Sequence, residues 1–478
     1  MTHSTAGAPH TAEHDHHPPA DPHRWAALTL ICVAQFMLIL DVTVVNVALP
    51  DMASDLDLGR ETLTWVVTAY TLCFGGLMLL GGRLADALGA RRTLLAGLVL
   101  FTAASLVTGL AQNAPTLLGG RIGQGVGAAL LSPAALSIVT TTFHGTERNK
   151  ALGVWAAIGG TGSAAGVLLG GALTDGPGWQ WVFYINVPVG LLLLLALPAF
   201  VPARAPQPAR LDIPGALLVT AGTAALIYGL VKAGDAGWAD ASTLLPLAGA
   251  VLAYAAFALV ERASRAPLMD LRMFTRRPVL AGAFLMLIAT ALLIAFFFLG
   301  SVYLQHVRGF SPLRTGLAFL PVAVATGIGA HLGSRLVGRI GSRPTAVAGM
   351  LVATAGTIPL TQLSETGSVY AGLLPGFVIA SFGIGAVFVT ATTTALAMVE
   401  PREAGLASGV VNTFHEVGGS IGVAVVSTVA ASGFERGAVG GFADAFTVCA
   451  VAAAVSAVVT LGLVPRGKPQ STGGPHVH

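Results

Sequence analysis

Charged residues are scarce in this chain of 478 residues. Only 10% of the residues are Asp, Glu, Lys or Arg, whereas 54% are hydrophobic, and the mean hydropathy is +0.77. A water-soluble protein of this length needs more polar side chains to cover its surface. The composition therefore excludes a soluble globular protein and predicts one that is surrounded largely by lipid.

Cysteines and basic clusters are also rare. Cys32, Cys73 and Cys449 lie in apolar stretches without Cys-x-x-Cys spacing, so we expect packing residues and no disulfide framework. The net charge is only +3, and no run of Lys and Arg could neutralise a series of phosphates. Nucleic acid is therefore not an expected partner.

Motifs of catalysis are missing as well. We find no HExxH, no GxSxG with plausible partners, no GxxxxGK[ST] phosphate loop and no paired catalytic carboxylates. These are the signatures of metalloproteases, serine hydrolases and ATP-binding proteins. The sequence thus predicts neither an enzyme nor a bound cofactor, and the irregularly spaced histidines of the two ends favour solvated tails over a metal site.

What the chain does contain is a series of apolar runs long enough to cross about 30 Å of hydrocarbon. They predict an all-α membrane protein with fourteen transmembrane helices. The expected spans are 25–49, 62–80, 93–111, 115–141, 149–173, 181–201, 213–231, 243–260, 278–302, 311–336, 345–363, 369–398, 403–431 and 441–464.

Loop charge provides an independent test of this count. With a cytoplasmic N-terminus, nineteen of the 25 Lys and Arg residues fall in cytoplasmic segments, five fall in outer loops, and Arg121 lies within a span. Short cytoplasmic loops normally hold this excess. We therefore expect a multi-pass protein of the cytoplasmic membrane with an even number of spans and both termini inside.

An internal repeat divides the chain. Gly82–Arg91 recurs as Ser334–Arg343 at an offset of 252, and Gly153, Gly162 and Gly166 recur as Gly409, Gly418 and Gly422 at an offset of 256. Two homologous six-helix bundles with two inserted helices explain both offsets. The predicted domains are a His-rich cytoplasmic tail (1–23), a first bundle (24–201), a linker with two helices (202–277), a second bundle (278–464) and a tail (465–478).

Ordered motifs give the chain a family resemblance. It resembles the major facilitator superfamily, specifically the fourteen-span drug:proton antiporters of the QacA type, over nearly its whole length between the tails. The motifs are Leu40–Pro50, Gly82–Arg92, Arg121–Gly127, the span 5 glycines and Trp179–Pro188. The resemblance implies efflux by alternating access, driven by the proton gradient, with a small-molecule substrate, protons and membrane lipid as partners and a monomeric state.

One departure concerns span 5. The family usually has Gly-Pro before its Gly-Gly pair, whereas here Val167 follows Gly166 ahead of Gly170 and Gly171. The missing proline weakens the implied export direction more than the implied fold.

Asp41 and Arg121 are the strongest candidates for proton coupling. An ionisable group inside a span is costly unless it is paired or faces a cavity, and their depths match when counted at about 1.5 Å per residue. An Asp beside a cation can link protonation to conformation. The alternative is a static ion pair that only fixes helix packing.

A second polar site is predicted near the midplane of span 13. Glu416 and His415 lie there, and we assign Asn46 and Gln124 to the same site. A carboxylate at this depth can attract a cationic substrate or carry a second proton, because such sites lie between the two halves. A residue that is merely hydrogen-bonded within the bundle is an equally good interpretation.

The segment after span 2 is a candidate gating loop, formed by Gly82, Asp86, Gly89, Arg91 and Arg92. Glycines serve its turns, and the short Asp86 side chain is expected to cap a helix N-terminus and pair with Arg91 or Arg92. The alternative is a simple topological anchor.

The glycine stripe of span 5 consists of Gly162, Gly166 and Gly170, with Gly171 beside it. Small residues at this spacing allow close helix contact. Sliding during transport and ordinary tight packing both fit.

The leading functional hypothesis is proton-coupled efflux of small hydrophobic or cationic compounds such as drugs or antibiotics. A dedicated exporter of one endogenous metabolite is the alternative, an importer is a weaker one, and a membrane enzyme or a sensor has little support.

Overall fold

The computed structural model describes residues 23–143, 145–201, 212–264, 275–363, 368–397, 404–431 and 439–466, and all regular structure in these ranges is helical. The tails at 1–22 and 467–478 lie outside these ranges. The helices in chain order are α1 (Arg24–Asp55), α2 (Arg60–Leu88), α3 (Ala90–Gly109), α4 (Ala114–Thr142), α5 (Gly145–Asp175), α6 (Trp181–Tyr184), α7 (Asn186–Phe200), α8 (Ile213–Ala236), α9 (Ala241–Ala263), α10 (Arg277–Val302), α11 (Pro312–Ile340), α12 (Ser342–Thr357), α13 (Leu374–Leu396), α14 (Ala404–Val429) and α16 (Val439–Leu463).

Twelve helices in the described part of the chain are long and apolar enough to cross a membrane. Each overlaps one of the spans expected from the sequence. Helices α5 and α14 also form where spans 5 and 13 were expected, over 31 and 26 residues. The all-helical prediction is thus confirmed, while the count of fourteen spans stays a prediction.

Short polar residues and prolines define several helix ends. The side chains of Asn113 and Ser311 accept hydrogen bonds from the backbone amides of Thr116 and Arg314 at the starts of α4 and α11. A proline follows each cap within two residues, where its missing N–H costs nothing. These signals define where α4 and α11 begin.

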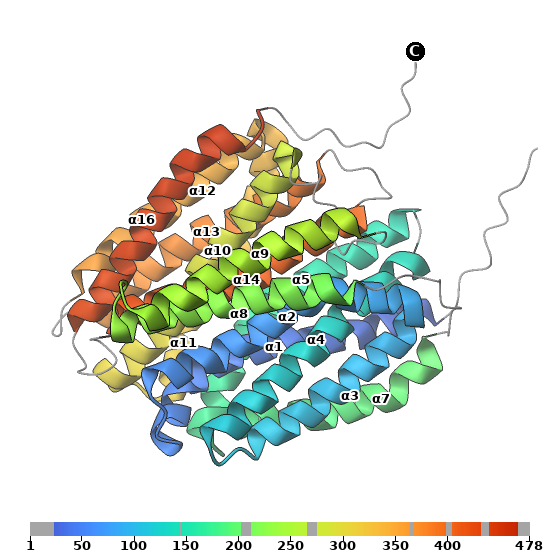
Figure 1. The fold of residues 1–478 in the computed structure, drawn as a ribbon, viewed down its shortest axis with the longest axis horizontal. Helices are drawn as coiled ribbons and strands as arrows, with labels where there is room; N and C mark the ends of the chain where they lie inside the picture. Colours follow the sequence, from blue (N-terminus) through green and yellow to red (C-terminus); the bar gives the residue numbers. More distant parts are fainter. Residues whose placement is uncertain are drawn as a thin grey trace, which may run out of the picture.

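The helices before α8 and those after α9 pack in the same pattern. In the first group α1 packs on α5, α2 on α4, and α3 on α4 and α7; in the second group α10 packs on α14, α11 on α13, and α12 on α13 and α16. The two groups lie side by side in Figure 1, blue to teal and yellow to red. They meet where α2 packs on α14 and α5 packs on α11.

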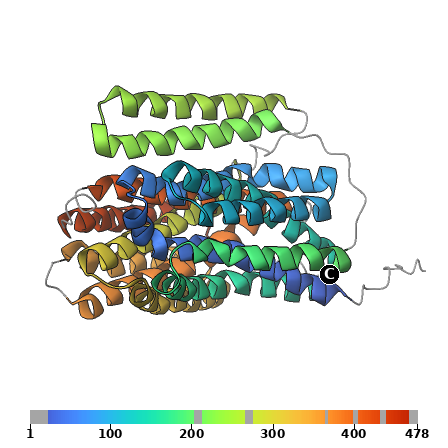
Figure 2. The same cartoon turned by 90° about the horizontal axis from the view of Figure 1, so that it is seen from below.

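The helices α8 and α9 form a hairpin along one side of the molecule. Figure 2 shows this pair as a separate green layer outside the remaining helices. Helix α8 packs on α2 and α14, so it covers the line along which the two groups meet. Helix α9 exposes Leu245, Val251 and Leu252, as expected of a surface in contact with lipid tails.

The apolar core joins the two groups. One cluster contains Leu49 of α1 and Leu63 of α2 together with Phe298 of α10 and Phe319 of α11. A second cluster, which includes Phe101 and Leu197, contains only residues that precede α8. The first group therefore has a core of its own as well as one that it shares.

Candidate functional site

A buried ion pair lies in the middle of the first group. Arg121 of α4 donates from Nη1 to Oδ2 of Asp41 in α1 at 2.5 Å, and the two side chains are 1% and 0% exposed. The matched depths expected from the sequence thus correspond to a direct contact. An ion pair removed from water is stable only if its remaining donors and acceptors are satisfied.

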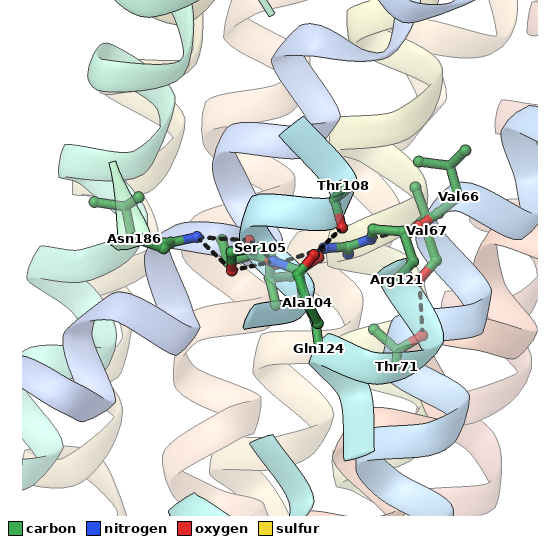
Figure 3. Close-up of polar contacts among 12 residues, drawn as sticks. Val66, Val67, Thr71, Ala104, Ser105, Thr108, Arg121, Gln124 and Asn186 are labelled. Carbon is green, nitrogen blue, oxygen red and sulfur yellow. Dashed lines mark hydrogen bonds and ion pairs between the residues drawn. The ribbon is translucent and has the colours of Figure 1, made fainter. Parts of the chain in front are cut away.

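Amide side chains complete the shell of Asp41. Its Oδ1 accepts from Nε2 of Gln124 at 2.9 Å and from Nδ2 of Asn186 at 3.1 Å. Gln124 also donates to Oγ of Ser105 at 2.9 Å. In Figure 3 Gln124 and Asn186 converge on Ser105 from different helices. Side chains of α4 and α7 therefore hold the carboxylate of α1, and Ser105 of α3 accepts hydrogen bonds from both amides.

Arg121 is held on its other side by α2. Its Nε donates to the backbone carbonyl of Val66 at 2.9 Å, and its guanidinium lies 4.4 Å from the ring centroid of Tyr70. The Phe183 ring is 5.9 Å away. A cation over an aromatic face gains stabilisation that grows when water is excluded. Arg121 therefore keeps partners that do not depend on the charge of Asp41.

The structure places Gln124 with Asp41 and Arg121. From the sequence we assign Gln124 to the Glu416 site, and that assignment stays a prediction. Ser105, Tyr70 and Asn186 were not assigned to the site at all. A signal for Ser105 did exist, since Thr102, Ser105 and Thr108 recur every three residues and mark one polar face of α3.

Glu416 and His415 lie on α14, where this helix meets α2 and α10. His415 Nε2 is 3.9 Å from Glu416 Oε1, and its Nδ1 is 2.8 Å from Oγ1 of Thr290 in α10. The His415 side chain is 40% exposed and that of Glu416 is 12% exposed. The Phe388 ring lies 5.7 Å from that of His415. The Glu416 carboxyl group, the His415 imidazole and the Phe388 ring thus form one partly exposed cluster in the second half.

Asn46 is fully enclosed in α1. Its Nδ2 donates to the carbonyl of Val42 in its own helix at 2.7 Å, and its Oδ1 is buried without a partner among the described residues. No contact between Asn46 and Glu416 is present in the part of the chain that the structure describes. Its assignment to the Glu416 site stays a prediction.

Hydroxyl pairs connect α2 to α14. Thr64 Oγ1 is 2.5 Å from Oγ of Ser427, and Thr71 forms a second short hydrogen bond with Ser420. Further along, Gly75 of α2 faces the Cβ of Glu416, which a side chain at position 75 would meet at 2.5 Å. This seam, defined by Thr64, Thr71 and Gly75 on α2, brings Glu416 against the first half.

The candidate gating loop is arranged differently from our expectation. Asp86 lies within α2, and the N-cap of α3 is Gly89, which makes no side-chain capping bond. The expected capping by Asp86 is therefore wrong, because α2 continues two residues past it. Arg83, on the same helix, lies within electrostatic reach of Asp86. Gly89 itself has φ +93°, a conformation that favours glycine.

Arg91 binds the end of another helix. Its Nη2 donates at 3.0 Å to the carbonyl of Pro198 near the C-terminus of α7, where a cation also complements the helix dipole. In the repeat, Arg343 donates from Nε at 2.6 Å to the carbonyl of Val464, just after α16. Gly341 matches Gly89, with φ +91°. The repeated motif thus makes the same contact twice, and it makes that contact within each half.

The glycine stripe of α5 faces α1. A Cβ at Gly162 would lie 2.9 Å from Ile39, one at Gly166 would overlap the Thr43 side chain, and one at Gly170 would lie 3.0 Å from Val44. In the repeat, Gly418 and Gly422 of α14 face the α10 backbone at Leu287 and Ala291 in the same way.

Gly171 behaves differently from its three neighbours in α5. A Cβ there would lie 2.8 Å from the backbone of Leu313 in α11, and Gly316 of α11 faces the carbonyl of Val167. The contact of Gly171 therefore crosses between the two halves.

Comparison with known proteins extends these findings. Residues 31–423 match the model of the Major Facilitator Superfamily. The chain is 43% identical to the puromycin resistance protein pur8 of Streptomyces alboniger over 86% of its own length and 82% of that protein. It is 37% identical to the cephamycin export protein CmcT of Amycolatopsis lactamdurans, covering 94% of this chain and 95% of the relative.

Solved structures support the fold. A peptide transporter POT in complex with sulfate superposes with a TM-score of 0.66 at 16% identity, over 91% of this chain and 94% of that one. A bacterial homologue of the lysosomal transporter Spinster gives 0.63 at 18% identity, over 93% and 96% of the two chains. At these identities the likeness concerns the fold alone.

The expected family, the cell-membrane location and the assignment as a transporter and not an enzyme are thereby confirmed. With its helical spans, its relatives in antibiotic resistance and export, and its fold, this chain belongs to the Major Facilitator Superfamily.

Proposed function

We propose that this efflux transporter expels small hydrophobic or cationic antibiotic-like compounds in exchange for protons, by alternating access of two six-helix bundles. The observation that supports the coupling most directly is the buried Asp41–Arg121 pair with its complete set of donors. The proton gradient supplies the energy in this proposal, and no cofactor takes part.

Protonation of Asp41 is the proposed switch. A neutral carboxyl attracts Arg121 far less than a carboxylate does. Arg121 then rests on the Val66 carbonyl, Gln124 and the Tyr70 ring. The contact between α1 and α4 weakens while that between α2 and α4 persists, so the proton changes which helices move together.

Glu416 and His415 form the proposed substrate site. A carboxylate that is only 12% exposed, beside a 40% exposed imidazole and the Phe388 ring, suits a cation with an apolar body. The site lies at the α2–α14 seam, between the halves, where alternating access exposes it to each side in turn.

A transport assay tests the coupling. Purified protein in liposomes with an imposed pH gradient should transport puromycin or ethidium, and Asp41→Asn should lose the part of the rate that depends on the gradient. Asp240→Asn is a matched control, since Asp240 is an exposed cap of α9. Full gradient-driven transport by Asp41→Asn would overturn the coupling.

Fourteen spans with cytoplasmic termini, in a monomer surrounded by lipid, complete the proposal. Cysteine labelling from outside intact cells tests the orientation. Leu88→Cys, at the end of α2, and Trp238→Cys, between α8 and α9, are both at exposed positions. The two cysteines should label from opposite sides only if α5 spans the membrane. Leu363→Cys and Arg466→Cys test α14 in the same way, and labelling from the same side would contradict the count.

A dedicated exporter of one compound is the second candidate. Several relatives carry the name of a single compound, such as cephamycin or tetracenomycin C, whereas another relative is named a multidrug resistance protein. Growth protection against a panel of unrelated antibiotics separates the two: protection against one chemical class alone favours the dedicated exporter.

A further inference from the structure

Tyr70 lies in α2, the helix that packs on α4 in the first half and on α14 in the second. It is fully buried, and its ring carries the Arg121 guanidinium at 4.4 Å. Its hydroxyl lies within electrostatic reach of Asp41, Glu416 and Arg121. These groups come from α1, α14 and α4, and His415 adjoins Glu416 on α14.

The hydroxyl of Tyr70 has no hydrogen-bond partner among the described residues. A buried donor without a partner loses its hydrogen bond to water without compensation, and it is uncommon in a well-packed interior. The neighbouring polar groups of the site are satisfied, since Gln124 and Asn186 both bond Asp41. The unpaired hydroxyl is therefore the exception within an otherwise complete network.

The backbone around Tyr70 keeps the residue in place between the two centres. On one side, Gly125 of α4 allows close approach, because a Cβ there would lie 2.5 Å from the Tyr70 carbonyl oxygen. On the other side, Gly75 lies five residues further along α2 and contacts Glu416. A small shift of α14 along the seam thus changes the distance from Glu416 to Tyr70 without disturbing the Arg121 contact.

We propose that Tyr70 is a positioning residue that couples Asp41 to Glu416: its single hydroxyl can donate to only one carboxylate at a time. The ring holds Arg121 in both states. The hydroxyl stabilises whichever carboxylate is ionised and within reach, so it opposes the ionisation of the other. The carboxylates of Asp41 and Glu416, on opposite sides of the seam, are therefore ionised in turn.

This inference rests on the proposed coupling through Asp41, but its test needs no transport. Infrared titration of the purified full-length protein in detergent follows the carboxyl band of Glu416, identified by its loss in Glu416→Gln. Neutralising Asp41 with Asp41→Asn should lower the pH at which Glu416 releases its proton by ~1 unit, because Asp41 no longer competes for the Tyr70 hydroxyl, which can then donate to the ionised Glu416.

Tyr70→Phe removes only the hydroxyl and leaves the ring on Arg121. In this background the shift caused by Asp41→Asn should fall to less than half. Tyr303→Phe is the matched control, since Tyr303 is equally buried but packs on Phe442 in the second half, and it should leave the shift unchanged. Thermal unfolding checks that each variant is folded.

Two results would overturn the proposal. One is an unchanged Glu416 titration in Asp41→Asn, and the other is a shift that is as large in the Tyr70→Phe background as in its absence. Because transport is measured separately, failure of this coupling would leave proton-driven efflux intact, and failure of efflux would leave the titration result standing.

Discussion

At the scale of single residues, the first half concentrates its polarity on one carboxylate. Asp41 receives donors from Arg121, Gln124 and Asn186, and Arg121 has further partners in Val66 and Tyr70. Charge-assisted bonds of this kind are stronger than neutral ones, and a missing partner leaves an uncompensated buried charge. The arrangement therefore predicts different effects for single and double substitutions.

Arg121→Gln alone should destabilise the protein by about 3–5 kcal/mol, because Asp41 would stay buried without its counter-ion. The double variant Asp41→Asn/Arg121→Gln should recover at least part of this loss, since neither charge remains, while gradient-driven transport stays absent. Thermal unfolding in detergent and the liposome assay measure the two effects. A double variant that transports normally would reduce the pair to a purely structural role.

A second prediction at this scale concerns Arg91 and Arg343. Each donates to a backbone carbonyl at the end of a helix in its own half. Replacement of either by Ala should lower stability by roughly 0.5–2 kcal/mol, since a charge-assisted bond at a helix C-terminus is lost. Equal losses in the two variants, measured by thermal unfolding, would support equivalent roles. A loss of transport without a loss of stability in Arg91→Ala alone would instead support a latch.

At the scale of helices, glycine decides which pairs can touch. Helix α5 lies against α1 through Gly162, Gly166 and Gly170, and α14 lies against α10 through Gly418 and Gly422. Any larger side chain at these positions meets the backbone or the stem of a neighbouring side chain. Close contact between membrane helices depends on such small residues, because lipid tails are as apolar as the helices.

Gly166→Val and Gly422→Val should each lower stability by about 1–3 kcal/mol through overpacking, and both should reduce the yield of folded protein. Gly249→Val on α9 is the matched control, because nothing lies within 4 Å of a Cβ at that position. Size-exclusion profiles and thermal unfolding of the purified variants give the comparison. Equal stability and equal yield of folded protein in all three variants would contradict the packing role of the glycines.

At the scale of the whole molecule, the two halves meet along α2 and α14 and along α5 and α11. The hydroxyl pair of Thr64 and Ser427 and the approach of Gly171 to α11 lie on these two contacts. The hairpin of α8 and α9 covers the first of them (Figure 2). Rocking of the halves must break or slide these contacts, whereas the contacts within each half can stay intact.

A disulfide across the seam should therefore stop transport. Thr64 and Ser427 have their hydroxyl oxygens 2.5 Å apart, so cysteines at both positions are close enough to join. Oxidised Thr64→Cys/Ser427→Cys should lose most of its transport, and reduction should restore it, while each single variant should keep its activity. Full transport by the oxidised double variant, with the cross-link shown by mass spectrometry, would exclude separation of the halves at this point.

Long apolar runs and motif spacing are local properties of the chain, so the all-helical membrane fold, the repeat and the family could be predicted from the sequence alone, while the count of fourteen spans stays a prediction. It also indicated that Asp41 and Arg121 share a depth. It did not reveal the roles of Ser105, Tyr70 or Asn186, and it predicted a helix cap at Asp86, which lies within α2. It also gave no sign that Gln124 donates to Asp41. Helices that are apolar on all sides leave their rotation and crossing undetermined, so only the tertiary structure decided which side chains of different helices meet around one carboxylate.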